Sequence, residues 1–261
     1  LRTTGGNGHI VVRTTAGSLT LNNGTAPGDD TAVSAHGSGN VLLQTLGAGT
    51  DITVNADLVS GSGNLSVLAA RSVVFTGTAD LRTSSSAATS GSLDVVAGTG
   101  SITQSATSVF LSLGASATAR LLAATNVTVG DIELTLGQVS ITATAGSILD
   151  ADVVTTTNDT DQDITASALR LVAGTGIADS VNHLETTVAT LSARAGSGSI
   201  YLLEADALTV DDVGLSVNRV VADGSVTLVS DAVQSDLRTT GGNGHIVVRT
   251  TAGSLTLNNG T

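Results

Sequence analysis

The chain has 261 residues and a formal net charge of −12, which comes from ten arginines, no lysine and 22 acidic residues. A chain this acidic is expected to repel nucleic acid and anionic membrane surfaces. The absence of cysteine excludes disulfides and thiolate chemistry, and two Phe with one Tyr are too few for a core built on large rings. No apolar run approaches the ~20 residues that a membrane-spanning helix needs.

The two ends of the chain carry the same sequence. Residues 1–25 recur without change as residues 237–261, so the sequence has a period of 236 residues. We predict that residues 1–236 are one tandem repeat unit and that 237–261 begin the next, with eight arginines against 22 acidic residues, a net charge of −14, in each unit. If successive units stack continuously, both copies should pack in the same way.

A shorter pattern of small residues, a glycine and then an aliphatic residue recurs along the unit. Its aliphatic positions, which we call anchors, are Leu19, Ile52, Val73, Ile102, Val127, Ile148, Ile177, Ile200, Val226 and Leu255. The nine intervals between anchors cover 236 residues, an average of about 26. The spacing therefore predicts about nine short structural repeats in each long one.

The segments beside the anchors alternate between apolar residues and Ser, Thr or Asp, as in Leu65–Ala69 and Ile52–Val54. This alternation is typical of β-strands, and glycine allows a sharp corner between two of them. A coil of about 26 residues can bury its aliphatic side only by stacking on other coils. We therefore predict an all-β fold: a parallel β-solenoid (β-helix), right-handed, with about nine coils per 236 residues.

Two alternatives to an uninterrupted solenoid remain open. Groups of three coils have the length of small immunoglobulin-like sandwiches, although such domains normally centre on a large aromatic residue. In addition, Ile177, Val181, Leu184, Val188 and Leu191 are spaced by 4, 3, 4 and 3 residues, which is a helical pattern. Because the end of this segment also alternates as a strand does, we favour a solenoid coil with a short helical or irregular excursion.

A resemblance to a known family arises from Leu184–Ile200 (LETTVATLSARAGSGSI) and Leu202–Gly214 (LLEADALTVDDVG). These segments resemble repeat units of giant repetitive bacterial surface or secreted proteins, the filamentous-haemagglutinin-like β-solenoid adhesins. In composition the resemblance extends over the whole chain. It implies a bacterial, extracellular or cell-surface location and a role in attachment, cell aggregation or a sheath, and it supplies no catalytic residues.

One acidic segment is a candidate metal site. Asp159, Asp161 and Asp163 lie at alternate positions, and calcium prefers several hard oxygen ligands. The glycine and the final glutamate of an EF-hand loop are missing, so we expect a solvated acidic loop, with weak Ca²⁺ binding as the alternative and no other cofactor. The glycine-rich start of the chain resembles a nonapeptide calcium repeat, but His9 replaces the aspartate and a plain turn is expected.

No nucleophile motif, phosphate-binding loop or dinucleotide fingerprint is present, so we predict that the chain is not an enzyme. The expected function is a structural segment of a long extracellular filament or adhesin that assembles head to tail at a cell surface or matrix, with lateral association as a further option. One alternative is a polysaccharide-active β-helix enzyme using Asp211 and Asp212 near Arg219, or Asp159–Asp163 near Arg170. Another is a flat ligand- or ice-binding face of aligned threonines.

Overall fold

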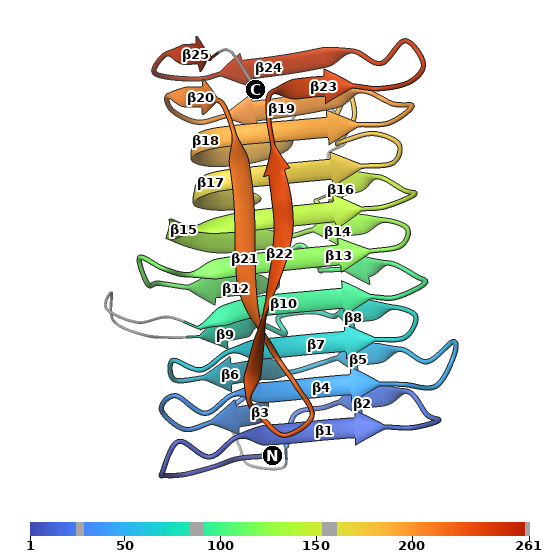
Figure 1. Ribbon diagram of the computed structural model, residues 1–261, viewed down its shortest axis with the longest axis vertical. Coiled ribbons are helices and arrows are strands. Elements are labelled where there is room, and N and C mark those ends of the chain that lie inside the picture. The colour runs from blue at the N-terminus through green and yellow to red at the C-terminus, as the bar shows by residue number, and fades with distance from the viewer. Residues whose placement is uncertain (25–28, 84–90, 153–160, 259–261) are drawn as a thin grey trace.

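A computed structural model describes residues 1–24, 29–83, 91–152 and 161–258. Parallel strands stack into a three-sided column, and an antiparallel hairpin runs along one side of it (Figure 1). The described residues contain no helix, and so none that is long and apolar enough to cross a membrane. The all-β, parallel-stack character of the prediction is confirmed, and no immunoglobulin-like sandwich is formed.

The front face, toward the viewer in Figure 1, contains parallel strands that pair from coil to coil. They are β1 (Ile10–Thr14), β4 (Val41–Thr45), β7 (Leu65–Ala69), β10 (Ser92–Ala97), β13 (Thr118–Ala123), the second halves of β15 (Asp131–Ala143), β17 (Ile164–Ala173) and β18 (Leu184–Ala195), then β20 (Leu208–Val210), β23 (Leu237–Thr239) and β25 (Leu255–Leu257).

The back face and the side face complete each coil. The back face consists of β3 (Thr31–Ala35), β6 (Asp57–Ser60), β9 (Leu81–Thr83), β12 (Val109–Ser112) and the first halves of β15, β17 and β18. The side face consists of β2 (Leu19–Leu21), β5 (Ile52–Val54), β8 (Val73–Phe75), β11 (Ile102–Thr103), β14 (Val127–Val129) and β16 (Ile148–Asp150). Strands β19 (Ile200–Glu204) and β24 (Ile246–Thr250) pair with each other and run from the side face onto the back face.

The predicted anchors form one ladder on the side face. The members in register are Leu19, Ile52, Val73, Ile102, Val127 and Ile148, followed through single bridges by Ile177 and Ile200. From Ile52 onward each of these side chains is fully buried. Eight of the ten predicted anchors therefore hold equivalent positions in successive parallel strands, as a parallel stack requires.

The last two anchors were wrong. Val226 begins a strand of the antiparallel hairpin and is 39% exposed, and Leu255 pairs with Leu208 on the front face. Ile246 takes the place beside Ile200 instead. The prediction failed here because a hairpin shows the same alternation and the same glycine corner (Gly224, φ +85°) as a coil. The division into nine coils consequently does not hold at the C-terminal end.

The core is one continuous stack of aliphatic side chains with a single aromatic pair. Phe75 and Phe110 are fully buried and meet edge to face, with ring centroids 4.7 Å apart. The segment with helical spacing forms no helix. Ile177 makes bridges on the side face, and Leu184–Ala195 is β18.

At the corners between faces, polar side chains stack and cap the backbone of the next coil. His9 Nδ1 accepts the N–H of Asn40, Asn40 Oδ1 accepts the N–H of Asn64, and Asn64 Oδ1 accepts the N–H of Ser92. These bonds satisfy donors that the strands themselves leave unpaired. They give His9 and the corner asparagines a structural role.

The two copies of the duplicated segment do not pack in the same way. In the first copy β1 lies on the front face against β4, and β2 lies on the side face against β5. In the second copy β24 pairs with β19, and β25 lies on the front face against β20. β24 and β25 have bounds equivalent to those of β1 and β2, but they lie on different faces. β23 corresponds only to an isolated bridge at Arg2 in the first copy. The expectation of equivalent packing was therefore wrong. Every face accepts alternating aliphatic residues, so the segment's own pattern does not select one of them.

The hairpin of β21 (Val213–Val220) and β22 (Val226–Gln234) interrupts a front-face strand. Val210 pairs with Leu191 and Leu237 pairs with Ala193, so the chain leaves this strand after residue 210 and returns at residue 237. Between these points the hairpin extends across the front face toward the N-terminal coils (Figure 1). At its tip, Asn40 Nδ2 donates to the carbonyl oxygen of Gly224 at 2.9 Å.

Candidate functional site

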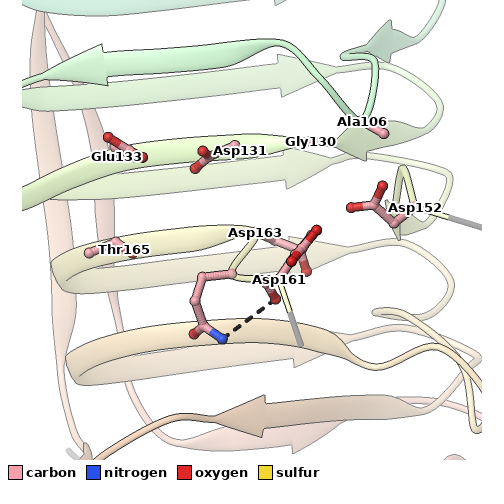
Figure 2. Close-up of a pocket in the computed structure, with 9 residues that line it drawn as sticks. Ala106, Gly130, Asp131, Glu133, Asp152, Asp161, Asp163 and Thr165 are labelled. Atoms are coloured by element: carbon pink, nitrogen blue, oxygen red, sulfur yellow. Dashed lines mark hydrogen bonds between the residues drawn. The ribbon is translucent and has the colours of Figure 1, made fainter. Parts of the chain in front are cut away.

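An acidic cavity of about 440 Å³ lies where the side and back faces meet (Figure 2). Its charged lining residues are all acidic, namely Asp131, Glu133, Asp152, Asp161 and Asp163. Two of the three predicted calcium ligands, Asp161 and Asp163, are therefore in this cavity. Asp159 lies outside the described residues.

Parallel stacking places several of these carboxylates above one another. Ile132 pairs with Ile164 and Ile164 pairs with Thr186, so Asp131, Asp163 and Glu185 hold the same position in three successive coils. Backbone bonds connect them, because Ile132 N–H donates to the carbonyl oxygen of Asp163 and Asp163 N–H donates to that of Glu185. Strands in a sheet are about 4.8 Å apart, a spacing at which like charges repel.

Val109 occupies this position in the coil before Asp131, and in the two coils before that the position is acidic but neutralised. Leu58 pairs with Leu81, which places Asp57 beside Asp80, and both carboxylates form ion pairs with Arg82. Within the described part of the chain, Asp131 and Asp163 have no ion pair with an arginine. Arg82 therefore balances Asp57 and Asp80, which Val109 separates from the acidic residues of the cavity.

Burial and mutual repulsion hold protons on these groups. Asp163 is 2% exposed, and burial together with the nearby charge of Asp150 raises its pKa to about 10. Burial and the charge of Glu133 raise the pKa of Asp131 to about 7. The expectation of a solvated acidic loop is thus wrong for Asp163, because the coil turns this side chain toward the neighbouring coil rather than into water.

Three carboxylates of this region converge closely enough to share a cation. One oxygen each of Asp150, Asp163 and Glu185 lie within 4.8 Å of one another. Such an all-oxygen group suits a hard divalent cation such as Ca²⁺. Sequence reasoning identified Asp163 but missed Asp150 and Glu185. The available signal was the coil period, since Glu185 follows Asp163 by 22 residues, close to one coil.

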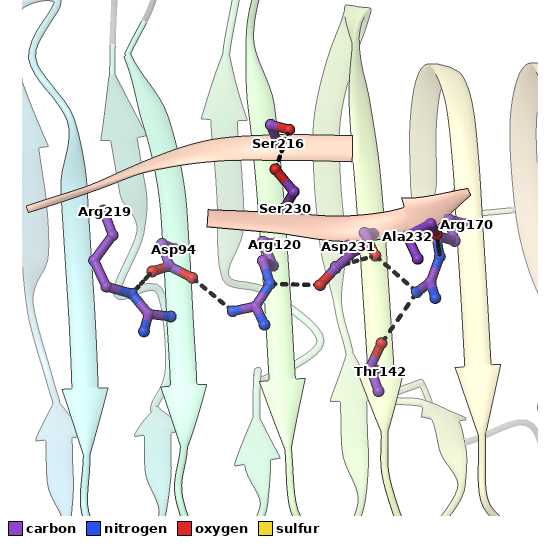
Figure 3. A network of polar contacts seen from close by, with 10 residues as sticks. Asp94, Arg120, Thr142, Arg170, Ser216, Arg219, Ser230, Asp231 and Ala232 are labelled. Carbon is purple, nitrogen blue, oxygen red and sulfur yellow. Dashed lines mark hydrogen bonds and ion pairs between the residues drawn. The ribbon is translucent and has the colours of Figure 1, made fainter. Parts of the chain in front are cut away.

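A second polar site lies between the hairpin and the front face (Figure 3). Asp94 is fully buried and accepts from Arg219 of the hairpin at 2.5 Å and from Arg120 of the next coil at 3.2 Å. Arg120 Nε also donates to Asp231 of the hairpin at 2.9 Å. Ser140 Oγ donates to the other oxygen of Asp231 at 2.7 Å. Two carboxylates and two arginines therefore connect the hairpin to the column.

The front-face partners of the hairpin form one row across six coils. Consecutive members pair in register, and they are Ser66, Asp94, Arg120, Ser140, Arg170 and Ser192. Each of them contacts the hairpin. At the two ends of the row, Val220 N–H donates to Ser66 Oγ and Gln234 Nε2 donates to Ser192 Oγ. This row of outward polar residues, together with buried Val217, positions the hairpin along the axis.

The residue combinations suggested for an enzyme are not brought together. Arg219 binds Asp94, and along β21 it is roughly 20 Å from the Asp211–Asp212 pair at the strand's start. Arg170 donates to the carbonyl oxygen of Ala232 on the front face, whereas Asp163 begins the back-face part of the same coil. Among the residues that the structure describes, which exclude Asp159, neither predicted acid–arginine pair is therefore formed.

His183 is 6% exposed and stacks on Tyr201 with ring centroids 5.5 Å apart. The alternative of a flat face of aligned threonines can also be placed. On the side face Thr20 and Thr53 pair in register, but Val74 occupies the same position in the next coil, so the threonine column is interrupted.

Comparison of the chain with protein-family models, with curated proteins and with solved structures found no match. The function is therefore argued from the geometry of the chain itself.

Proposed function

We propose that the chain is a structural segment of a long extracellular filament or adhesin, in which stacked coils form a rigid acidic rod. The observation that supports this most is the continuity of the strand ladders. On the front face each coil pairs with the next from β1 to β18, and one apolar core runs through the whole stack. A fold of this kind is extended by adding coils.

The last coil has an apolar surface suited to receive another coil. Ile246 is 44% exposed and Leu257 is 69% exposed. The identical residues of the first copy, Ile10 and Leu21, are 8% and 7% exposed in their different placement on the front and side faces. Burying such side chains contributes about 1.5–3 kcal/mol each, which favours continued stacking.

The junction between repeat units needs one adjustment. Each copy of the duplicated segment has a neighbouring coil on one side only, and the two copies occupy different faces. In a longer chain both sides are covered, so we propose that all internal copies adopt a single placement. Strictly equivalent units then follow one another along the rod.

The site of action that we propose is a bacterial cell surface or the extracellular matrix, in line with the resemblance to giant surface adhesins. The net charge of −14 per unit supports an extended, soluble rod, because like-charged rods repel one another. Lateral association then requires counterions, and divalent cations are the most effective.

Electron microscopy of a chain of three consecutive 236-residue units tests the proposal. At about 4.8 Å per coil and eight or nine coils, one unit should add about 40 Å of length to an unbranched rod. Fibre diffraction should show a meridional spacing near 4.8 Å. Separate beads joined by linkers, or a length that does not increase with the number of units, would refute the proposal.

A further inference from the structure

The outer surface of the hairpin is an uncharged, partly apolar strip on an acidic molecule. The only charged residues in β21 and β22 are Arg219 and Asp231, and both are bonded to the front face of the column. Val226, Leu228 and Val233 of β22 are 39%, 69% and 66% exposed. A chain with a net charge of −12 therefore presents one strand that a like-charged neighbour can approach without close repulsion.

Near the tip of the hairpin, the column occupies the edge of β21. Asn218 and Val220 donate their N–H groups to the hydroxyl oxygens of Ser92 and Ser66 on the front face, at 3.0 and 2.9 Å. These two N–H groups therefore point away from β22. In an antiparallel pair, residues directly opposite each other either exchange both backbone hydrogen bonds or both direct their backbone groups outward.

The other edge of the hairpin, on β22, is consequently open. Leu228 and Val226 are the cross-strand partners of Asn218 and Val220, so their N–H and C=O groups point away from β21. The backbone groups of Ser230, two residues further along, point the same way. Within the described part of the chain, β22 pairs with no strand other than β21. Because β21 lies against the column here, the open edge of β22 faces away from it.

An open strand edge is a template for pairing with another strand, and many proteins protect such edges with charged residues, proline or a bulge. The segment Val226–Ser230 (VTLVS) contains no charged residue and no proline. The register shift of the hairpin lies elsewhere, between Val213 and Leu215. The hairpin runs along the column (Figure 1), and coils added at either end lengthen the column along the same axis. Stacking therefore leaves this edge uncovered.

We propose that β22 of one chain pairs antiparallel with β22 of a second copy, about a two-fold axis at Leu228. Val226 of each chain then lies opposite Ser230 of the other, and the two Leu228 residues meet at the axis. The same segment serves both partners, as a two-fold interface requires. Because β22 runs along the column, the two columns lie side by side and point in opposite directions (Figure 1).

The pairing deepens the rod proposal, on which its role in attachment or cell aggregation rests. A single contact between two five-residue segments is small, but two rods with the same 236-residue period present their hairpins at the same interval. One contact per unit then adds to the next, and the combined affinity exceeds that of one contact. The acidic charge on the rest of both surfaces opposes close approach, so salt should strengthen the pairing.

Sedimentation equilibrium of the single chain at low and high salt tests the pairing. The dimer fraction should rise with salt. Leu228→Glu should weaken dimerisation by about tenfold or more, because two carboxylates then meet at the axis. Leu228→Pro should also weaken it, because it removes the outward N–H without adding charge, and edge strands tolerate proline. Leu257→Glu is the matched control, since Leu257 is equally exposed, at 69%, but lies in the last coil.

A crosslinking measurement locates the contact. The chain has no cysteine, so Leu228→Cys introduces a single thiol. A short bismaleimide should then join two copies through this position in high salt. Leu46→Cys places the thiol at another exposed leucine, 46% exposed at a corner of the column, and should give no crosslinked dimer.

Three outcomes would overturn the proposal: a monomer at every salt concentration, a dimer that Leu228→Glu leaves unchanged, and a dimer that salt weakens. Self-association that Leu257→Glu abolishes and Leu228→Glu does not would place the contact at the ends of the column. In the microscope, three-unit chains carrying Leu228→Glu in every unit should form single rods of unchanged length, whereas the natural sequence should form paired rods. Failure of the pairing and failure of the rod proposal are therefore distinguishable.

Discussion

Replacing Asp94 by alanine should separate the hairpin from the column. Asp94 is fully buried and joins Arg219 of the hairpin to Arg120 of the column. Removing one partner of a buried ion pair leaves the other charge uncompensated, at a cost of about 3–5 kcal/mol. Here Asp231 still pairs with Arg120, whose side chain is 8% exposed, and Arg219 is 26% exposed and can reach water. We therefore expect the free energy of unfolding to fall by about 3 kcal/mol, the lower end of this range.

The hairpin can be excised to give a matched background for this measurement. Val210 pairs with Leu191, and Asp236 accepts the N–H of Ala193 through its carbonyl oxygen at 2.9 Å. Deleting residues 211–235 joins Val210 to Asp236 and restores an uninterrupted front-face strand. In this shortened chain Asp94 faces water and Arg219 is absent, so Asp94→Ala should cost at most about 1 kcal/mol.

Urea unfolding of the four chains, with and without the hairpin and with and without Asp94, gives a coupling free energy of about 2 kcal/mol. Asp51→Asn serves as a surface control, because its pair with Arg71 is exposed and should contribute little to stability. In the full-length Asp94→Ala chain, the amides of β21 and β22 should exchange faster than those of β10. An equal cost of Asp94→Ala in both backgrounds would refute the reasoning, since the network would then not hold the hairpin.

Three further predictions concern the acidic cavity and the core. Raised pKa values of Asp163 (about 10), Asp131 and Glu204 (both about 7) mean that the folded chain binds these protons more tightly than the unfolded chain. The stability that these three groups contribute is therefore full below about pH 4 and falls as pH rises toward 7, by up to about 1.4 kcal/mol per pH unit and carboxyl. Melting curves from pH 4.5 to 7.5 should show this fall, and Asp163→Asn should flatten it; a melting temperature that rises with pH contradicts the account. At pH 7 millimolar Ca²⁺ should raise the melting temperature of the natural chain but not of Asp163→Asn, and an equal response of both chains would exclude this cluster as the cation site. Ile102→Ala in the anchor ladder should lower the free energy of urea unfolding by about 2–5 kcal/mol. Thr103→Ala, on the outer side of the same strand, should lower it by less than about 0.5 kcal/mol. Similar values for both variants would contradict the inward direction assigned to Ile102.

The coil period was accessible from the sequence because its causes are local. Alternation of apolar and polar residues, a glycine corner and a spacing of about 26 residues place Ile52, Ile102 and Ile148 in one ladder. The same reasoning misassigned Val226, since an antiparallel hairpin obeys the same local rules as a coil. Strand direction and the choice of partner strand depend on residues far away in the chain, and no local pattern encodes them.

The candidate sites show a similar division. Asp163 stood out as part of an acidic run, but its contacts with Asp150 and Glu185 arise from stacking three coils. The row from Ser66 to Ser192 looks in the sequence like ordinary outward polar residues. Only the return of the hairpin over the front face buries it. Arg194 and Arg238 likewise come from separate coils and are paired through the register of β18 with β23.

The local residue pattern specifies the repeating element: short strands with aliphatic inner sides, joined by turns at glycines, that must stack to bury those sides. Only the packing of the whole chain determines which face each strand joins, where the hairpin lies and which charged groups are buried. The physical reason is that alternation and turns act over a few residues. Face, register and burial are settled by the summed packing of neighbouring coils, as the two placements of one identical 25-residue segment show.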